Sequence, residues 1–288
     1  MDAAIQQALR EGEKLGLRYA VQIPQVAASG FAGSRLGRRA GTSIDFQDYR
    51  EYQPGDDLRF IDWNVYARTD RLSVKLFREE VTPHVDLVID GSRSMNLEGT
   101  GKARAVAALS AIIATAAANA QCTHAAWLSG DGFHRLANDN LTPSAWDGLD
   151  LSSARTMDES FEMMSPKLRR LGIRVLISDL LWPGQPMDTV RRLRDGAAQL
   201  FVIQLLGRDD ATPPQRGNLR LLDSETGEES EVYVDALVEK QYGERLAALQ
   251  QAWDDACRQC GARLTTIIAE DFEKSLGELE GIELLAPA

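Results

Sequence analysis

The sequence predicts an α/β fold in which a mostly parallel sheet is covered by helices on both faces. Three observations support this prediction. Apolar runs of strand length alternate with longer amphipathic segments from about residue 84 onward. Parallel neighbours need crossover connections, which such helical segments supply. A chain of 288 residues, of which 44% are hydrophobic, is also long enough to bury a large core.

The predicted strands are apolar runs bounded by turn residues and too short to be helices in a domain of this size. They comprise Val85 to Ile89, Ala125 to Leu128, Ile173 to Ile177, Leu200 to Leu206 and Leu264 to Ile268. The predicted helices between them carry apolar residues at i, i+3 and i+4 spacing. They comprise Lys102 to Ala120, Met157 to Leu171, Asp188 to Ala198 and Ala236 to Cys260.

Residues 1 to 80 break this alternation and are expected to form an N-terminal, β-containing extension ahead of an α/β domain at residues 81 to 288. The extension begins with a predicted amphipathic helix. The Gly- and Arg-rich stretch "SGFAGSRLGRRAGTS" is expected to be an exposed loop. Alternating residues in "RLSVKLFREE" predict a strand at the edge of the sheet or in a small β-extension. A hairpin is predicted within residues 223 to 235, turning at Thr226 and Gly227.

The charge of the chain argues against some classes of partner. Asp and Glu number 43 against 32 Lys and Arg, giving a formal net charge of -11 and a pI near 4.9. This balance disfavours general affinity for nucleic acid or anionic membranes, although it does not exclude a local basic patch. No stretch has the character of a signal peptide or a membrane span. A soluble cytoplasmic protein without membrane insertion is therefore expected.

Oxygen-bearing side chains follow two of the predicted strands. In "VDLVIDGSRSM", Asp90 ends an apolar strand, and Ser92 and Ser94 follow at alternate positions. In "LISDLL", Asp179 follows a later strand. Ligands of open α/β sheets bind outside the carboxyl ends of the strands. One carboxylate and two hydroxyls there suit a hard divalent cation such as Mg2+, and Thr156 and Asp179 are expected to complete the oxygen cage.

This arrangement resembles the metal-ion-dependent adhesion site of von Willebrand factor A domains, which have a Rossmann-like fold. The resemblance implies that Ser92 and Ser94 bind the ion directly. It also implies that Asp90 and Asp179 act mainly through water, and that Thr156 binds either way. The ion would be Mg2+, or Mn2+ or Ca2+ in its place. The assignment of Thr156 rests on its spacing, and the nearby competitors for its role are Thr142, Ser152 and Ser153.

A second resemblance, to a more specific family, comes from the upstream segment "DFQDYREYQPGDDLRFIDWNVYARTDRLSVKLFREE". It is similar to the signature of the bacterial domain-of-unknown-function family 58 (DUF58), whose members carry it ahead of a von Willebrand factor A-like domain. The matching positions are Arg50, Tyr52, Gly55, Asp56, Asp57, Arg59, Ile61, Asp62, Trp63, Ala67 and Arg68. This family is often encoded beside MoxR-type AAA+ ATPases. The resemblance therefore implies an adaptor or co-chaperone that works with such an ATPase or its client protein.

The expected function is that of a non-enzymatic module that engages a partner carboxylate through a bound cation. Two alternatives remain open. One is a metal-dependent hydrolase, for which Asp179 is the only base offered near the ion. The other is a metal-free scaffold that binds through the loop from Arg35 to Arg39. The charged signature is interpreted either as a clasp of arginine–carboxylate pairs around Tyr52 and Trp63 or as a partner-binding surface.

Other motifs argue against other classes of enzyme. Ser92 stands where a haloacid-dehalogenase-type phosphatase needs a second acid, and no glycine-rich stretch fits a P-loop. Cys257 and Cys260 form a C-x-x-C pair at the end of a predicted helix, whereas a thioredoxin-like pair opens one, so packing is expected there. Arg93 and Lys102 lie near the cage in sequence and are expected to compete electrostatically with a cation.

Overall fold

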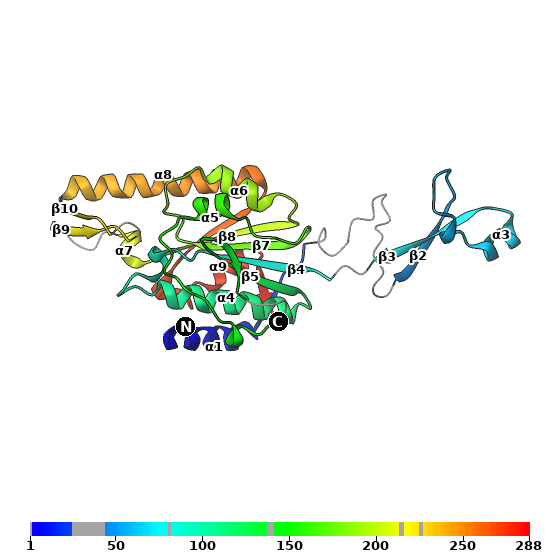
Figure 1. The fold of residues 1–288 in the computed structure, drawn as a ribbon, viewed down its shortest axis with the longest axis horizontal. Helices are drawn as coiled ribbons and strands as arrows, with labels where there is room; N and C mark the ends of the chain where they lie inside the picture. Colours follow the sequence, from blue (N-terminus) through cyan, green and yellow to red (C-terminus); the bar gives the residue numbers. More distant parts are fainter. Residues whose placement is uncertain (1, 25–43, 80–81, 137–140, 213–215, 225–226) are drawn as a thin grey trace. The chain divides into compact units, whose positions relative to one another are not determined.

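The computed structural model describes residues 2–24, 44–79, 82–136, 141–212, 216–224 and 227–288. It contains two compact units, whose elements are labelled in Figure 1. The large unit comprises Met1–Pro24 and Pro83–Ala288, and the small unit comprises Gln25–Thr82. The chain therefore leaves the large unit after Pro24 and returns to it at Pro83.

A six-stranded sheet forms the centre of the large unit. Its strand order is β11-β8-β7-β4-β5-β6, and all neighbours are parallel except β6, which runs antiparallel to β5. The strands are β4 (His84–Ile89), β5 (Thr123–Gly130), β6 (Gly132–Arg135), β7 (Ile173–Ser178), β8 (Gln199–Leu206) and β11 (Arg263–Ile268). The five predicted strands are confirmed. β6 is not predicted, because so short a strand shows no clear alternation of apolar and polar residues.

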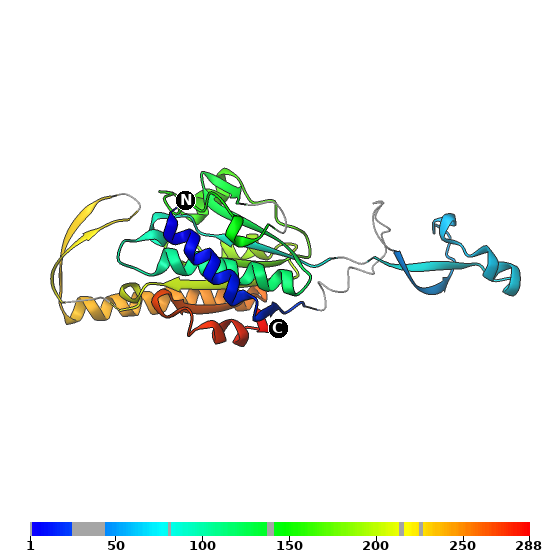
Figure 2. The same ribbon diagram turned by 90° about the horizontal axis from the view of Figure 1, so that it is seen from below.

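Helices cover both faces of this sheet, as Figures 1 and 2 show. Those on one face are α1 (Ala3–Gly16), α4 (Lys102–Asn119) and α9 (Leu276–Gly281), and those on the other are α5 (Met157–Met163), α6 (Pro186–Arg194) and α8 (Ala236–Cys260). The side chains of β4 alternate between the two hydrophobic cores: Leu87 and Ile89 join the first, and Val88 joins the second. A strand with both faces buried is typical of a parallel sheet.

Two predicted helices are shorter than expected. α5 stops before Met164, which is extended, and Pro166 disfavours a helical conformation at the residue before it. α6 stops short of Gly196, whose φ of 68° is left-handed. α8 has the predicted bounds, and Gly261 follows it with a φ of 64°. Glycine is favoured there because it adopts the left-handed conformation without strain.

Two glycines allow α1 to lie close against α4. A Cβ atom at Gly12 would lie 2.3 Å from the carbonyl oxygen of Ala108, and one at Gly16 would lie 2.8 Å from that of Ile112. No larger residue fits at either position without moving the backbone of one helix. The small residues of α1 therefore fix how deeply it sits on α4.

The first helix belongs to the large unit, whereas the sequence analysis places it in a domain of residues 1 to 80. After α1, β1 (Tyr19–Val21) pairs antiparallel with β12 (Leu285–Pro287), at the other end of the chain. This pairing and the packing on α4 hold the segment in place. Only Gln25–Thr82 forms a unit of its own.

The predicted hairpin is present between β8 and α8. β9 (Gly217–Leu222) and β10 (Glu229–Val234) are antiparallel. Gly227 in the turn has a φ of 75°, and Thr226 lies outside the described residues. The short helix α7 (Arg208–Ala211) connects β8 to this hairpin.

The small unit is built on an antiparallel pair, β2 (Ile44–Glu51) and β3 (Ser73–Glu79). Between them lie a 3₁₀ turn (Leu58–Phe60) and α3 (Trp63–Thr69). In the described part of the chain β3 pairs in a sheet with β2 alone, so "RLSVKLFREE" forms a small β-extension and not the edge of the sheet. The Gly- and Arg-rich stretch, residues 29–43, lies outside the described residues. None of the described helices is long and apolar enough to cross a bilayer.

Candidate functional site

The carboxyl ends of β4 and β7 form the candidate site. These strands are neighbours in the sheet, and the chain leaves β4 toward β5 on one side and returns to β7 on the other. Such a position is the topological switch point of an open α/β sheet, where diverging loops leave a crevice. Asp90 follows β4 and Asp179 follows β7. The fold therefore brings these two predicted acids to one edge.

The carboxylate of Asp90 is buried among hydrogen-bond donors. Its Oδ2 accepts from the hydroxyl of Ser178 at 2.5 Å, and its Oδ1 accepts from the backbone N–H of Ser92 at 3.0 Å. Burial raises the pKa of Asp90 to about 6, and the negative charge of Asp179 contributes to the rise. Ionisation of Asp90 is therefore costly unless a positive charge is close.

Ser92 and Ser94 direct their hydroxyls toward each other, and their Oγ atoms are 3.0 Å apart. This distance is that of a hydrogen bond between them. It is also the distance between adjacent ligands of an octahedral ion with bonds of about 2.1 Å, such as Mg2+. A remote loop supports the turn: the N–H of Ser153 donates to the carbonyl of Gly91 at 3.0 Å, and the N–H of Arg93 donates to that of Ser153 at 2.9 Å.

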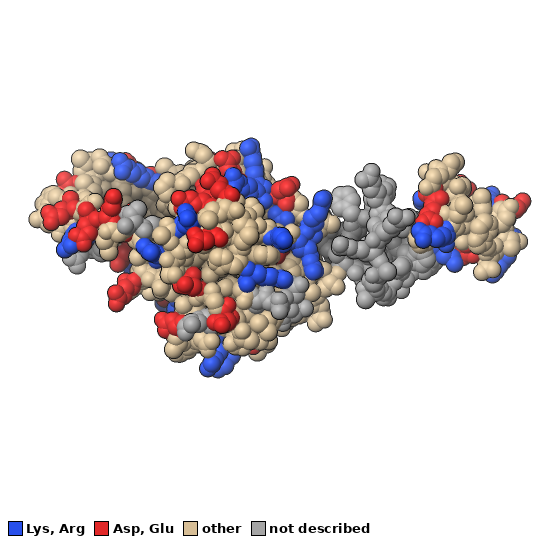
Figure 3. Space-filling view, viewed as in Figure 1, with Lys and Arg blue, Asp and Glu red and all other residues tan. Residues whose placement is uncertain are grey.

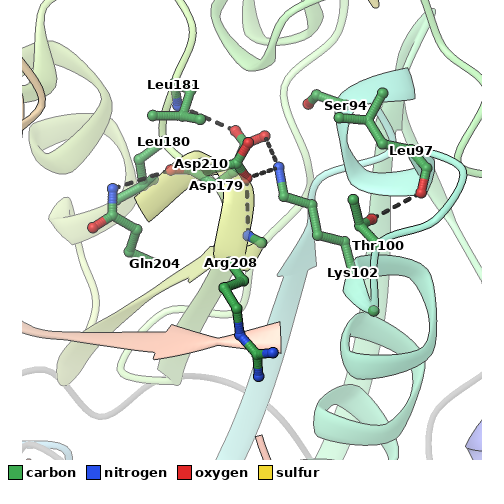
Figure 4. A network of polar contacts seen from close by, with 12 residues as sticks. Ser94, Leu97, Thr100, Lys102, Asp179, Leu180, Leu181, Gln204, Arg208 and Asp210 are labelled. Carbon is green, nitrogen blue, oxygen red and sulfur yellow. Dashed lines mark hydrogen bonds and ion pairs between the residues drawn. The ribbon is translucent and has the colours of Figure 1, made fainter. Parts of the chain in front are cut away.

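Lys102 places a positive charge in the same site, as Figure 4 shows. Its side chain is completely buried, and its Nζ lies 3.1 Å from Oδ2 of Asp179 and 2.6 Å from Oδ2 of Asp210. Burial disfavours the charge of Lys102, but the two carboxylates outweigh burial and raise its pKa. The ammonium group thus bridges two acids from the ends of neighbouring strands.

Asp210 is a site residue that the sequence analysis does not identify. It lies in α7, just after β8. Its carboxylate accepts from the N–H of Gly207 at 2.8 Å, and its carbonyl accepts from the hydroxyl of Tyr242 at 2.5 Å. The available sequence signal was an acid just beyond a third strand end, in "LLGRDD". Its contact with Lys102 arises only in the folded chain, so no local sequence pattern predicts it.

Asp179 lies in a constrained turn. Its Oδ1 accepts from the N–H of Leu181 at 3.1 Å, and its carbonyl accepts from the side chain of Gln204 at 3.1 Å. Leu180 has a φ of 60°, in the left-handed region that a bulky residue rarely adopts. Such strain persists where the surroundings fix the backbone, which is common at functional sites.

Thr156 is placed differently from the other predicted ligands. Its hydroxyl accepts from the N–H of Glu159 at 3.3 Å, and its own N–H donates to the Glu159 carboxylate at 2.8 Å, which forms the cap of α5. Thr142 precedes a separate 3₁₀ turn. Ser152 accepts from the side chain of Arg93 at 3.1 Å through its carbonyl. Ser152 and Ser153 are therefore the loop residues that contact the segment carrying Ser92 and Ser94.

The donor set suits a divalent cation in part. Two carboxylates and two hydroxyls are oxygen ligands of the kind that Mg2+ prefers. No group of three His, Cys, Asp or Glu side chains that could hold a metal occurs within the described ranges, so hydroxyls and water must complete the coordination. The ammonium of Lys102 already pairs with Asp179. A cation bound here therefore has to compete with Lys102.

The signature residues of the small unit bond to one another or to neighbouring residues of the same segment. Asp62 caps α3, and its carboxylate lies 3.0 Å from Nζ of Lys75 and accepts from the hydroxyl of Tyr49 at 2.9 Å. The hydrogen bond from Lys75 is the main cause that lowers the pKa of Asp62 to about 2. Trp63, which begins α3, is 60% exposed, and Arg68 in the last turn of α3 is exposed too.

Two arginine–carboxylate pairs complete the signature. Arg50 pairs with Asp56 and Arg59 pairs with Asp57, each at 2.6 Å. These pairs lie on exposed surfaces, where each contributes only about 0–1 kcal/mol to stability. The other signature residues of this region lie beside the pairs, at the end of β2 and in the following turn: Tyr52 and Gly55. All of these contacts are internal to the small unit.

The fold and the site define a mixed α/β protein with a mostly parallel central sheet and an acidic strand-end site. The family profile described as "Protein of unknown function DUF58" matches residues 48–252, and the chain belongs to this family. Uncharacterized proteins from Mycobacterium bovis and Mycobacterium tuberculosis are each 30% identical over 254 residues, covering 82% of this chain and 78% of the relative.

Solved structures give weaker likenesses. The conserved hypothetical protein BatB from Bacteroides thetaiotaomicron has a TM-score of 0.35 at 9% identity, covering 69% of this chain and 99% of that one. An aerotolerance-related membrane protein from Bacteroides fragilis has a TM-score of 0.34 at 12% identity, covering 68% of this chain and 97% of that one. These scores are too low to define the fold.

Proposed function

We propose that the large unit is a von Willebrand factor A-like domain that binds a divalent cation and, through it, a carboxylate of a protein partner. The observation that carries the proposal is the convergence of oxygen-bearing side chains at the switch point of the sheet: Asp90, Ser92, Ser94 and Asp179. The raised pKa of Asp90 supports it, because burial and then the charge of Asp179 disfavour its ionised form, and a bound cation would offset both.

The residues of the site would have separate roles in holding the ion and in orienting its ligands. The hydroxyls of Ser92 and Ser94 and the carboxylates of Asp90 and Asp179 would hold Mg2+ or Mn2+. When bound, the ion supplies a coordination position for a carboxylate from the partner. The bonds from Ser178 and from the Ser92 N–H orient Asp90, so the chain prepares the site in advance.

A hollow beside the site offers space for a partner segment. Its volume is about 580 Å³, within the range of ligand-binding clefts, and it opens next to Ser152 and Ser153 at the end of β5. Asp131, Asp150 and Arg155 contribute to its lining. A segment whose carboxylate reached the ion would therefore have a polar surface to lie against.

The family resemblance supports a MoxR-type AAA+ ATPase, or a client of one, as the partner, and an adaptor role without catalysis. The hydrolase alternative needs a general base beside the ion. Asp179, the candidate base, is bonded to Nζ of Lys102 and to the N–H of Leu181, which disfavours that role. The scaffold alternative relies on Arg35 to Arg39, which lie outside the described residues.

Calorimetric titration of Mg2+ and Mn2+ into the metal-free protein tests the proposal. We expect the wild type to bind one ion and Asp90→Ala to weaken binding at least tenfold. Asp147→Ala is the matched control, because Asp147 is exposed and its carboxylate accepts from the N–H of Gly148. A wild type that binds neither ion, or an Asp90→Ala variant that binds as well as the control, would refute the metal site.

Capture of the partner tests the adaptor role separately. The probe is the purified MoxR-type ATPase from the same organism, mixed with the protein with and without EDTA. We expect capture that EDTA and Asp90→Ala both abolish. Capture that survives both treatments would show that the cation is not the bridge, and failure to capture in every condition would argue against this partner.

A further inference from the structure

Three sulfur-bearing side chains gather where α6 packs against α8 (Figure 1). Cys257 and Cys260 lie in the last turn of α8, and Met187 lies in the first turn of α6. The Sγ atom of Cys260 is 3.8 Å from the Sδ atom of Met187. The two cysteines are three positions apart, so their side chains are neighbours on one face of the helix. We call these three side chains the sulfur cluster, and none of them belongs to the strand-end site.

The sulfur cluster reaches from the core to the surface. Cys257 is 1% exposed and belongs to the second hydrophobic core, in agreement with the packing expected from the sequence. Cys260 and Met187 are half-buried and pack at the edge of the same core. A metal ion would therefore enter from the side of Cys260 and Met187, and most of its surroundings would be apolar once it was bound.

The thiols of the sulfur cluster are poorly suited to redox exchange. Burial raises the pKa of Cys257 to about 12, and the charges of Asp254 and Cys260 contribute to the rise. The thiolate, which is the reactive form of cysteine, is therefore scarce at neutral pH. The end of a helix adds to this effect, because its free carbonyl groups disfavour a negative charge. A bound metal ion removes the obstacle, since it displaces the proton and neutralises the thiolate.

The carboxylates nearest to the two cysteines in sequence already have a partner. Nη2 of Arg258 lies 2.5 Å from Oδ2 of Asp254 and 3.1 Å from Oδ1 of Asp255. Figure 3 shows acidic and basic side chains mixed over α6 and α8, so this surface does not attract hard cations through its charge. Within the described ranges, no three His, Cys, Asp or Glu side chains form a group that could hold a metal. The thioether of Met187 is therefore the third ligand that the chain offers beside the two cysteines.

We infer that the sulfur cluster binds Cu(I). Thiolate and thioether ligands are soft and select Cu(I), whereas Zn2+ sites use Cys, His and carboxylate ligands. With metal–sulfur bonds of about 2.3 Å, two ligands of a trigonal or tetrahedral ion lie about 3.8–4.0 Å apart. The separation of 3.8 Å between the sulfur atoms of Cys260 and Met187 falls in this range. Two thiolates and one neutral thioether would hold the ion, and the half-buried side would let it exchange with another thiol ligand.

Competition with the chelator bathocuproine disulfonate, in the presence of ascorbate, measures the affinity of the whole chain for Cu(I). We expect the wild type to take up one ion, and Cys260→Ala and Met187→Leu each to weaken binding at least tenfold. Cys122→Ala and Met163→Leu are the matched controls, because Cys122 lies in the first hydrophobic core and Met163 is 52% exposed at the end of α5. Both controls should bind like the wild type, and circular dichroism confirms that each variant is folded.

X-ray absorption at the copper edge counts the sulfur ligands. We expect three in the wild type and two in Met187→Leu. A wild type that binds no Cu(I), or cluster variants that bind like their controls, would overturn the site. Weaker binding in Cys260→Ala but not in Met187→Leu would overturn the assignment of the thioether as a ligand. Tighter binding of Zn2+ than of Cu(I) by the wild type would overturn the choice of ion.

Discussion

The two ends of the central sheet use charge in opposite ways. At the carboxyl end, the carboxylates of Asp179 and Asp210 pair with the buried ammonium of Lys102, and Asp90 lies close enough to Asp179 for its pKa to be raised by that charge. At the amino end, the buried carboxylate of Asp86 lies beside His84 and accepts from Trp127 and from the N–H of Arg169. The carboxyl end buries an ammonium among carboxylates, whereas the amino end buries a carboxylate among hydrogen-bond donors.

This difference shows two ways in which a single sheet can hold a buried charge at the ends of its strands. A buried charge is tolerated only where it is paired and hydrogen-bonded. Both ends meet this condition with internal partners. The carboxyl end retains an excess of acid that suits a cation, because Asp179 and Asp210 share one ammonium and Asp90 adds a third carboxyl group, whereas the single carboxylate of the amino end is matched by its hydrogen-bond donors.

The largest expected effect comes from removing the internal cation. Lys102→Met keeps an unbranched side chain, one atom shorter, but leaves Asp179 and Asp210 without their ammonium partner. We expect the free energy of unfolding in EDTA to fall by about 3–5 kcal/mol, as for other broken buried pairs. Because the competitor is gone, Mn2+ should also bind more tightly and restore part of the lost stability. Urea denaturation with and without Mn2+ measures both effects.

The control for this prediction is Lys240→Met on α8, whose side chain is 72% exposed. That change should alter stability by no more than about 0.5 kcal/mol. A Lys102→Met variant as stable as the control would show that the acids of the carboxyl end need no internal cation. The contrast between the two ends of the sheet would then be lost.

The next effect concerns pH at the carboxyl end. The folded-state pKa of Asp90, about 6, lies above the unfolded value of about 3.9, so folding favours the protonated form. Its contribution to stability is therefore fully present below about pH 4 and is lost as the pH rises to about 6. Asp90→Asn should remove this dependence. In EDTA at pH 8 the variant should be more stable by up to about 3 kcal/mol.

Urea denaturation of the wild type and Asp90→Asn between pH 4 and pH 8 measures this difference. The two curves should converge near pH 4. Parallel curves over the whole range would mean that Asp90 titrates at its ordinary pKa in the folded protein. Excess Mg2+ should reduce the difference at pH 8, because a bound cation favours the ionised form of Asp90.

The smallest effect is expected at the amino end. Asp86→Asn removes the charge of this side chain but keeps an oxygen that can accept hydrogen bonds. We expect the free energy of unfolding to fall by about 1–2 kcal/mol, because charge-assisted bonds become neutral ones. Urea denaturation measures this change, and an unchanged free energy of unfolding would mean that the charge of Asp86 does not strengthen its hydrogen bonds.

Much of the fold follows from local pattern. Each predicted strand of the large unit is an apolar run with buried residues, and α8 has both predicted bounds because Asp235 caps its start and Gly261 follows its end. The helix after Thr156 is overpredicted, because an apolar spacing continues past Met164, where the chain turns to the extended conformation before Pro166. Local pattern therefore finds elements better than it finds their ends.

The candidate site is predictable only in part, for a physical reason. The positions of Asp90 and Asp179 follow from the rule that parallel strands end at the same edge. The sequence places Lys102 near the cage but does not show that it bonds to Asp179, 77 positions later, or to Asp210. Such contacts arise from the reach of a long side chain across the folded sheet. The contacts of Asp86 likewise join residues of β4, β5 and the loop before β7.

The pairing of β1 with β12 has a consequence for the integrity of the large unit. Ala20 is aligned with Ala286, and α1 is held against α4 through the close approach at Gly12. A protease that cut the backbone between residues 25 and 82 would therefore leave two fragments. The short N-terminal fragment, with α1 and β1, would remain bound to the long one through α4 and β12. The large unit has the layout of a split protein, in which two separately made fragments can reassemble without a covalent link.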